Sequence, residues 1–171
     1  MTFIQKGTKE YKQASAALFI GGFVTFAVLY TTQPLLPVIA KEFQISAASS
    51  SLSLSVTTGI LAFAILFSAG LSDSFGKKKI MTISLFITSV LGFLTALSPN
   101  FSSLLAVRAL MGIFIAGVPS IAMAYVGEEF DPGTIGKVMG LYISGTGLGG
   151  MAGRIFAGVL TDLFSWRAAL A

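Results

Sequence analysis

Cysteine and histidine are both absent from this chain of 171 residues. Without cysteine there can be no disulfides or thiol chemistry, and without histidine the chain lacks both a common zinc ligand and the most usual general base. Charged residues are scarce as well, at 11%, whereas soluble domains carry about 25%. These absences argue against metal sites and hydrolytic enzymes, and the low charge indicates a protein that lies in lipid.

Long apolar runs take the place of the missing charge. They cover 14–36, 50–71, 80–97, 102–126 and 138–160, and each has the length of a spanning helix, about 17–25 residues. The first run is too long for a secretory signal, whose apolar region has about 7–15 residues. We therefore predict an all-α membrane protein with five transmembrane helices, preceded by a tail at 1–13 and followed by the start of a sixth helix at Trp166.

Basic residues are unevenly divided between the two sides that five crossings would create. The N-terminal side holds Lys6, Lys9, Lys12, Lys77, Lys78, Lys79 and Lys137, against only Lys41 and Arg167 on the other. Loops rich in lysine and arginine stay in the cytoplasm, so we expect a cytoplasmic N-terminus. The net charge of +4 then reports orientation, and we expect no nucleic acid partner.

The connection between the second and third expected helices carries the most distinctive pattern. Residues 73–79 read Asp-Ser-Phe-Gly-Lys-Lys-Lys. A solvated turn explains the lysines well and Asp73 less well, because an acid at a helix C-terminus opposes the helix dipole. The segment resembles the loop motif of the major facilitator superfamily, Gly-x-Leu-Ala-Asp-Arg-x-Gly-Arg-Lys, at Leu71, Asp73, Gly76, Lys77 and Lys78, and it departs from the motif at Ala69 and Ser74. The resemblance implies that Asp73 latches the cytoplasmic ends of two transporter halves.

Arg108 lies about 9 Å inside the fourth expected helix, at 1.5 Å per residue. Its side chain could snorkel to the headgroups or carry a charge into a cavity. The run from Arg108 to Gly112 resembles the superfamily motif Arg-x-x-x-Gly, which implies a role in proton coupling, although Met111 replaces the usual glutamine.

Arg154 lies at a similar depth in the fifth expected helix, and none of the seven acids falls within a spanning run. The two arginines could be compensated by a carboxylate on further helices, an anionic substrate, cavity water or snorkelling. Tyr30 and Gln33, near the outer end of the first helix, are candidates with Arg154 for lining a substrate cavity.

Gly145, Gly149 and Gly153 repeat every four residues along the fifth expected helix. Such a stripe favours close helix packing within this half of the protein. The resemblance offers the alternative of a sliding contact with a second half, although the proline of the antiporter motif is missing here.

A weak internal repeat relates the second and fifth helix ends. Gly70, Asp73 and Lys77 recur as Gly158, Asp162 and Arg167 on the opposite face. Two three-helix units in inverted topology would give this order of glycine, acid and base on opposite faces. The residues that end one helix and begin the next could also produce so short a match.

The resemblance extends over nearly the whole chain and is closest to bacterial inner-membrane transport proteins of the YnfM-like, arabinose-efflux-permease type. It implies an incomplete N-terminal helical domain at 14–171 and a missing C-terminal half. The implied function is proton-coupled efflux or antiport of a small molecule by alternating access, in the lipid bilayer and without a cofactor beyond the proton gradient.

Two other function classes remain. The chain could be a complete five-helix membrane protein with a structural or interaction role. An intramembrane enzyme would need a nucleophile paired with a base, and the sequence offers no such pair.

Overall fold

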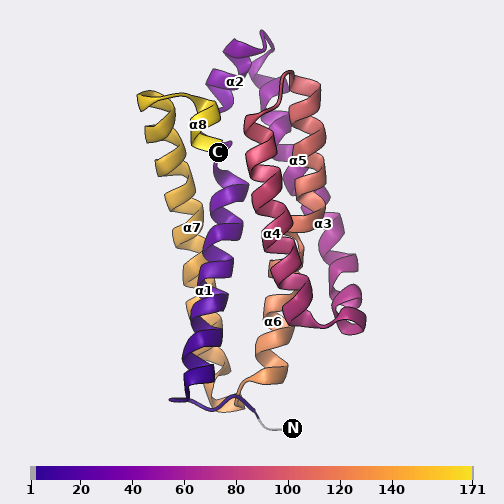
Figure 1. The fold of residues 1–171 in the computed structure, drawn as a ribbon, viewed down its shortest axis with the longest axis vertical. Helices are drawn as coiled ribbons and strands as arrows, with labels where there is room; N and C mark the ends of the chain where they lie inside the picture. The colour runs from indigo at the N-terminus through magenta and orange to yellow at the C-terminus, as the bar shows by residue number, and fades with distance from the viewer. Residues whose placement is uncertain (1–2, 171) are drawn as a thin grey trace.

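The protein is a bundle of helices that run up and down beside one another (Figure 1). The computed structural model describes residues 3–170, without the side chains of residues 69 and 71–73. The helices in this part are α1 (Lys9–Tyr30), α2 (Leu36–Glu42), α3 (Ala47–Phe75), α4 (Lys77–Ala96), α5 (Phe101–Ile115), α6 (Gly117–Glu129), a 3-10 turn η1 (Pro132–Thr134), α7 (Ile135–Leu163) and α8 (Trp166–Leu170). The all-α prediction is confirmed for the described residues.

Four segments of the described chain are long and apolar enough to cross a membrane. They are Lys9–Tyr30, Ala47–Ser68, Lys77–Ala96 and Phe101–Glu129, the last of which combines α5 and α6. Large apolar side chains on the outside of the bundle also indicate contact with a membrane. Phe63, Leu66 and Phe67 of α3 are each more than 70% exposed. Such a surface suits lipid and not water.

The fifth expected span, α7, is not among these four. The helix has 29 residues, which is about 44 Å at 1.5 Å per residue and long enough to cross. Its composition sets it apart, because its many glycines, together with Arg154, contribute little hydropathy. The helix follows α1 along its length (Figure 1).

The expected fourth helix is divided into α5 and α6 around Ala116. Pro119 accounts for the break, because it has no N–H to donate to the carbonyl of Ile115 four residues earlier. Gly117 lies at the same level and lets α4 come close, since a Cβ there would lie 1.9 Å from the Ser84 hydroxyl. The proline therefore bends the span at the point where α4 packs against it.

The residues before α1 are attached to the connection between α6 and α7. The Ile4 amide donates to the Glu129 carbonyl at 2.7 Å, and the Asp131 amide donates to the Ile4 carbonyl at 3.2 Å. Ile4 also packs against a buried cluster that contains Phe130. The helix itself begins at Lys9, capped by the Thr8 side chain, so part of the expected tail is helical.

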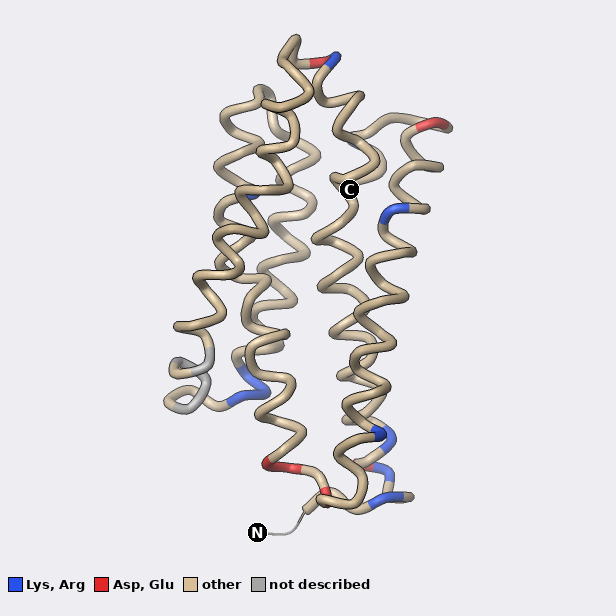
Figure 2. Tube along the Cα trace, turned by 180° about the vertical axis from the view of Figure 1, so that it is seen from behind, with Lys and Arg blue, Asp and Glu red and all other residues tan. Residues whose placement is uncertain are grey.

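Charged positions gather at the two ends of the bundle, with few between them (Figure 2). One end, here called the basic end, carries the N-terminal residues, the turn between α3 and α4, and the connection from α6 to α7. The opposite end carries α2, α8 and the turn between α4 and α5 (Figure 1). The lysines that the sequence assigns to one side therefore lie together at the basic end.

Candidate functional site

Arg108 of α5 is 1% exposed, although it lies on a candidate spanning segment. Its Nε donates to the Ser53 carbonyl at 3.1 Å, and Nη1 lies 3.3 Å from the sulfur of Met111. Nη2 donates to the Leu29 carbonyl at 3.1 Å and to the Thr32 hydroxyl at 2.9 Å. All of these partners are neutral, so the charge is compensated by dipoles.

The end of α1 supplies one of these dipoles. The last four carbonyls of a helix lack partners within the helix and carry the negative end of its dipole. Leu29 belongs to this last turn, because α1 ends at Tyr30. Arg108 therefore caps the C-terminus of α1 from a neighbouring helix. Backbone carbonyls were not among the compensating groups considered from the sequence.

Gly112 brings α3 close enough for this arrangement. A Cβ at Gly112 would lie 2.7 Å from the Thr57 carbonyl oxygen, which is too close for any real side chain. The Thr57 hydroxyl in turn donates to the Arg108 carbonyl at 3.0 Å. The glycine four residues after the arginine thus lets α3 supply both the Ser53 carbonyl and the Thr57 hydroxyl.

Arg108 also borders a cavity of about 260 Å³. The lining comes from α1, α4, α5 and α8, and it includes Thr31, Ser89, Thr95 and Leu170. Three of these four side chains are hydroxyl-bearing, so the space next to the guanidinium is partly polar. The arginine neither snorkels to the surface nor lies in an open groove of this chain.

Arg154 of α7 has a second set of neutral partners, all near the end of α1 or on its own helix. Its Nε donates to Gln33 Oε1 at 2.6 Å, and its Nη1 donates to the Gly150 carbonyl at 3.0 Å. The guanidinium carbon lies 4.1 Å above the centre of the Tyr30 ring. The structure therefore brings the three expected cavity residues, Tyr30, Gln33 and Arg154, into direct contact.

The three stripe glycines of α7 lie against the backbone of α1. A Cβ at Gly145, Gly149 or Gly153 would lie 2.4, 2.1 and 2.4 Å from the carbonyl oxygens of Phe19, Phe23 and Ala27, respectively. No side chain fits at such distances, so glycine is required for the two helices to touch. The stripe is covered within this chain, and α7 is thereby placed so that Arg154 reaches Tyr30.

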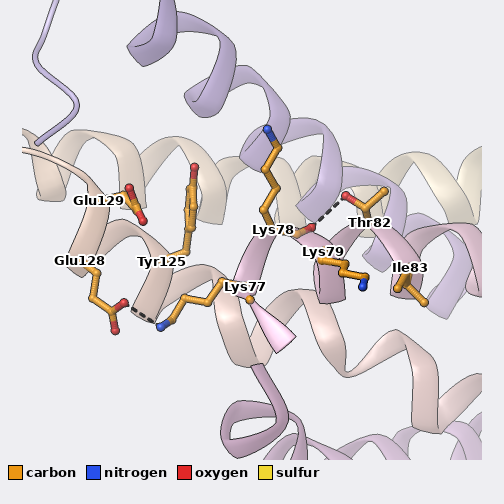
Figure 3. Close-up of a pocket in the computed structure, with 9 residues that line it drawn as sticks. Lys77, Lys78, Lys79, Thr82, Ile83, Tyr125, Glu128 and Glu129 are labelled. Atoms are coloured by element: carbon orange, nitrogen blue, oxygen red, sulfur yellow. Dashed lines mark hydrogen bonds and ion pairs between the residues drawn. The ribbon is translucent and has the colours of Figure 1, made fainter. Parts of the chain in front are cut away.

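The basic end carries an ion pair between helices that are far apart in sequence. Lys77 Nζ lies 2.7 Å from Glu128 Oε2 and ties the start of α4 to the end of α6. Figure 3 shows these two side chains pointing toward each other, with Lys79 directed elsewhere. Lys78 and Glu129 also line this open hollow of about 910 Å³.

Gly76 makes the sharp turn that starts α4. Its φ of 89° lies in the left-handed region that glycine adopts readily. The side chains of Leu71 and Asp73, which belong to the same expected motif, lie outside those that the structure describes.

The opposite end holds a cluster that the sequence analysis did not assemble. Glu42 accepts hydrogen bonds from the Trp166 indole and the Arg167 guanidinium, each at 2.5 Å. Arg167 also donates to the Ser98 carbonyl at 3.1 Å. The Trp166 hydrogen bond, more than the partner charge of Arg167, holds the pKa of the Glu42 carboxyl below its ordinary value, although partial burial opposes this.

Sequence separation explains why this cluster was missed. Glu42 and Trp166 are 124 residues apart, and no local pattern joins them. The available signal was the presence of an acid, Glu42, and a Trp-Arg pair at connections on the same expected side.

The family model described as Major Facilitator Superfamily matches residues 18–171. An uncharacterized transporter of the same type from Bacillus subtilis, YybF, is 47% identical over 170 residues, which is 99% of this chain and 42% of the relative. The inner membrane transport protein YnfM of Escherichia coli is 44% identical over 169 residues, which is 99% of this chain and 40% of that protein.

A more distant relative carries a more specific name. The antiporter QDR3 of Candida albicans is 30% identical over 156 residues, which is 88% of this chain and 22% of that protein. The chain spans about two fifths of the length of the two bacterial relatives. Because the family model matches most of its residues, this chain belongs to the major facilitator superfamily of membrane transporters.

Proposed function

We propose that the chain is the front part of a secondary active transporter that exports a small molecule in exchange for protons. The observation that carries this proposal is the family match over residues 18–171. The relative named as an antiporter supports exchange as the mode of transport. Substrate would bind between this part and a C-terminal half, and rocking of the two would alternate access.

We place the basic end in the cytoplasm of a bacterial cell and count α7 as a fifth crossing of the inner membrane. The uneven distribution of lysines supports this orientation. The close packing of α7 against α1 supports its inclusion, because a helix in contact along a spanning helix lies at the same depth.

Arg108, with Gly112, is the proposed coupling element. Its guanidinium is held by carbonyls and a hydroxyl and by no carboxylate of the described residues. A charge without a counter-charge in a buried site is sensitive to any further charge that arrives nearby. Proton binding elsewhere in the transporter would therefore change the free energy of this buried site.

The switch proposed at the basic end consists of Leu71, Asp73, Gly76, Lys77 and Lys78. The ion pair between Lys77 and Glu128 supports a role in fixing the ends of α4 and α6 relative to each other. Asp73 would complete the latch to the second half. In a transport-competent assembly, Asp73→Asn should lower turnover more than substrate binding, and an equal loss of both would contradict the latch.

The test compares this chain alone with the chain co-expressed with the part of the Bacillus subtilis relative beyond the matched region. Purified protein is placed in vesicles that enclose a pH-sensitive dye, and candidate solutes are added under an imposed proton gradient. We expect solute-dependent proton movement only when both parts are present. Specific, gradient-driven flux with this chain alone would contradict the proposal.

A further inference from the structure

Arg154 is a half-buried cation whose partners in the described chain are all uncharged. It lies nine residues before the end of α7 at Leu163, about 14 Å at 1.5 Å per residue. Asp162 is eight residues away along the same helix, roughly 12 Å and beyond direct contact. The charge of Arg154 is therefore not neutralised by its surroundings.

The side-chain nitrogens that Arg154 and Gln33 leave without a partner in the described chain carry only donors. A guanidinium carries five N–H groups, of which Nε and one on Nη1 are used by Gln33 and Gly150. Nη2 donates to no atom of the described residues. Because Gln33 must offer its oxygen to Arg154, its amide nitrogen is directed away with two further N–H groups. A ligand here must accept hydrogen bonds.

Arg108 does not supply a second charge to the same ligand. It is 1% exposed, and its three nitrogens are occupied by partners on α1, α3 and α5. Of Arg108 and Arg154, only Arg154 thus has a nitrogen atom, Nη2, without a partner among the described residues. One available positive charge matches a ligand group with one negative charge.

The position of Tyr30 narrows the ligand further. Its ring lies 4.1 Å from the guanidinium carbon and covers one face of the plane. A ligand can therefore approach along the edge that carries the Nη atoms, which is the edge that binds a planar carboxylate with two parallel hydrogen bonds. Phe26 continues the aromatic surface, with its ring centre 6.3 Å from that of Tyr30.

We propose that Arg154, Gln33 and Tyr30 form a carboxylate site, so that the transported molecule is a monocarboxylate with an apolar or aromatic body next to its charge. The reference to a transported molecule rests on the proposed transport function. The site itself is a property of this chain, and its binding is measurable without transport.

The test uses the purified chain in detergent, with benzoate as the probe and benzamide as its uncharged counterpart. Binding is followed by the shift of the thermal unfolding midpoint, read from the single tryptophan. Benzoate at millimolar concentrations should raise the midpoint, and benzamide should not. Arg154→Gln should weaken benzoate binding about tenfold or more, because it removes the charged fork.

Gln33→Glu provides a variant that keeps the fold even if Arg154→Gln does not. The new carboxylate of residue 33 would pair with Arg154 and neutralise its charge. Benzoate should then no longer raise the unfolding midpoint, while the midpoint without ligand is retained or rises. Lys137→Gln is the matched control, since it removes one positive charge from the basic end of α7 and should leave benzoate binding unchanged.

Three results would overturn the carboxylate site. They are no benzoate effect on the unmodified chain, equal effects of benzoate and benzamide, or equal losses in Lys137→Gln and Arg154→Gln. Benzoate binding that depends on Arg154, together with no flux in the two-part vesicles, would leave the site in place and contradict the transport proposal alone.

Discussion

At the scale of single residues, the buried Arg108 is held by the end of a helix and by no acid of the described chain. The sequence places this arginine inside an apolar run and so predicts that something must compensate it. The partner carbonyls could not be predicted, because Leu29 and Ser53 lie 79 and 55 residues away and any residue type supplies a carbonyl. The burial of Arg108 could not be predicted either, because it depends on how the helices pack and not on the sequence pattern.

Glu42 gives a pH prediction at this scale. Its pKa is lowered in the folded chain by the Trp166 indole first and then by Arg167. A lowered folded pKa means that the contribution to stability is present above the unfolded value, about 4.3, and is lost as pH falls through the folded value. Acidification should therefore narrow the difference in unfolding midpoint between the unmodified chain and Glu42→Gln.

The expected effect is small. The Glu42 side chain is 40% exposed, and water screens such pairs so that they contribute below about 1 kcal/mol. The measurement is the unfolding midpoint of both proteins in detergent from neutral pH to below the unfolded pKa. A gap that widens as the pH falls would contradict the assigned role of the cluster.

At the scale of elements, the apolar runs predict most helices, and the exceptions have physical causes. The division of the fourth run follows from Pro119, which lacks the N–H that a continuous helix needs. The early start of α1 follows from the Thr8 cap, since charged residues can occupy the part of a helix beyond the membrane. The stripe spacing predicts tight packing of α7, but not that α1 is the partner.

Two alanine substitutions test the packing of α7 against α1. A Cβ at Gly149 would lie 2.1 Å from the Phe23 carbonyl oxygen, whereas a Cβ at Gly147 would meet nothing within 4 Å. Gly149→Ala should therefore lower the free energy of unfolding by about 1–3 kcal/mol. Gly147→Ala should leave it unchanged or raise it by up to about 1 kcal/mol, because alanine favours a helix.

Thermal unfolding in the same detergent measures both variants. Equal midpoints for Gly149→Ala and Gly147→Ala would show that the close contact between α1 and α7 is absent in the membrane protein.

At the scale of the whole molecule, ion pairs close both ends of the bundle in equivalent ways. At the basic end, Lys77 opens α4 and pairs with Glu128 at the end of α6. At the opposite end, Arg167 lies at the start of α8 and pairs with Glu42, the last residue of α2. In each case a base at the start of one helix meets an acid at the end of another, since Glu128 lies in the last turn of α6 and Glu42 ends α2. This is the relation that an inverted repeat predicts.

The absence of cysteine makes the orientation easy to measure. Gln5→Cys places a thiol at the basic end, and Phe164→Cys places one at the opposite end, where the residue is 73% exposed. A membrane-impermeant maleimide added to intact spheroplasts should label Phe164→Cys only. Gln5→Cys should react after the membrane is permeabilised. The reverse pattern would contradict a cytoplasmic basic end.

In the proposed function, the buried charge of Arg108 couples proton movement to transport. The most direct measurement is the pH dependence of solute-driven proton flux in the two-part vesicles, with the unmodified chain and with Arg108→Ala. We predict that the variant, once shown to be folded and inserted, has a flattened or displaced pH profile. An unaltered pH profile at reduced rate would contradict the coupling role and leave Arg108 as a structural cap of α1.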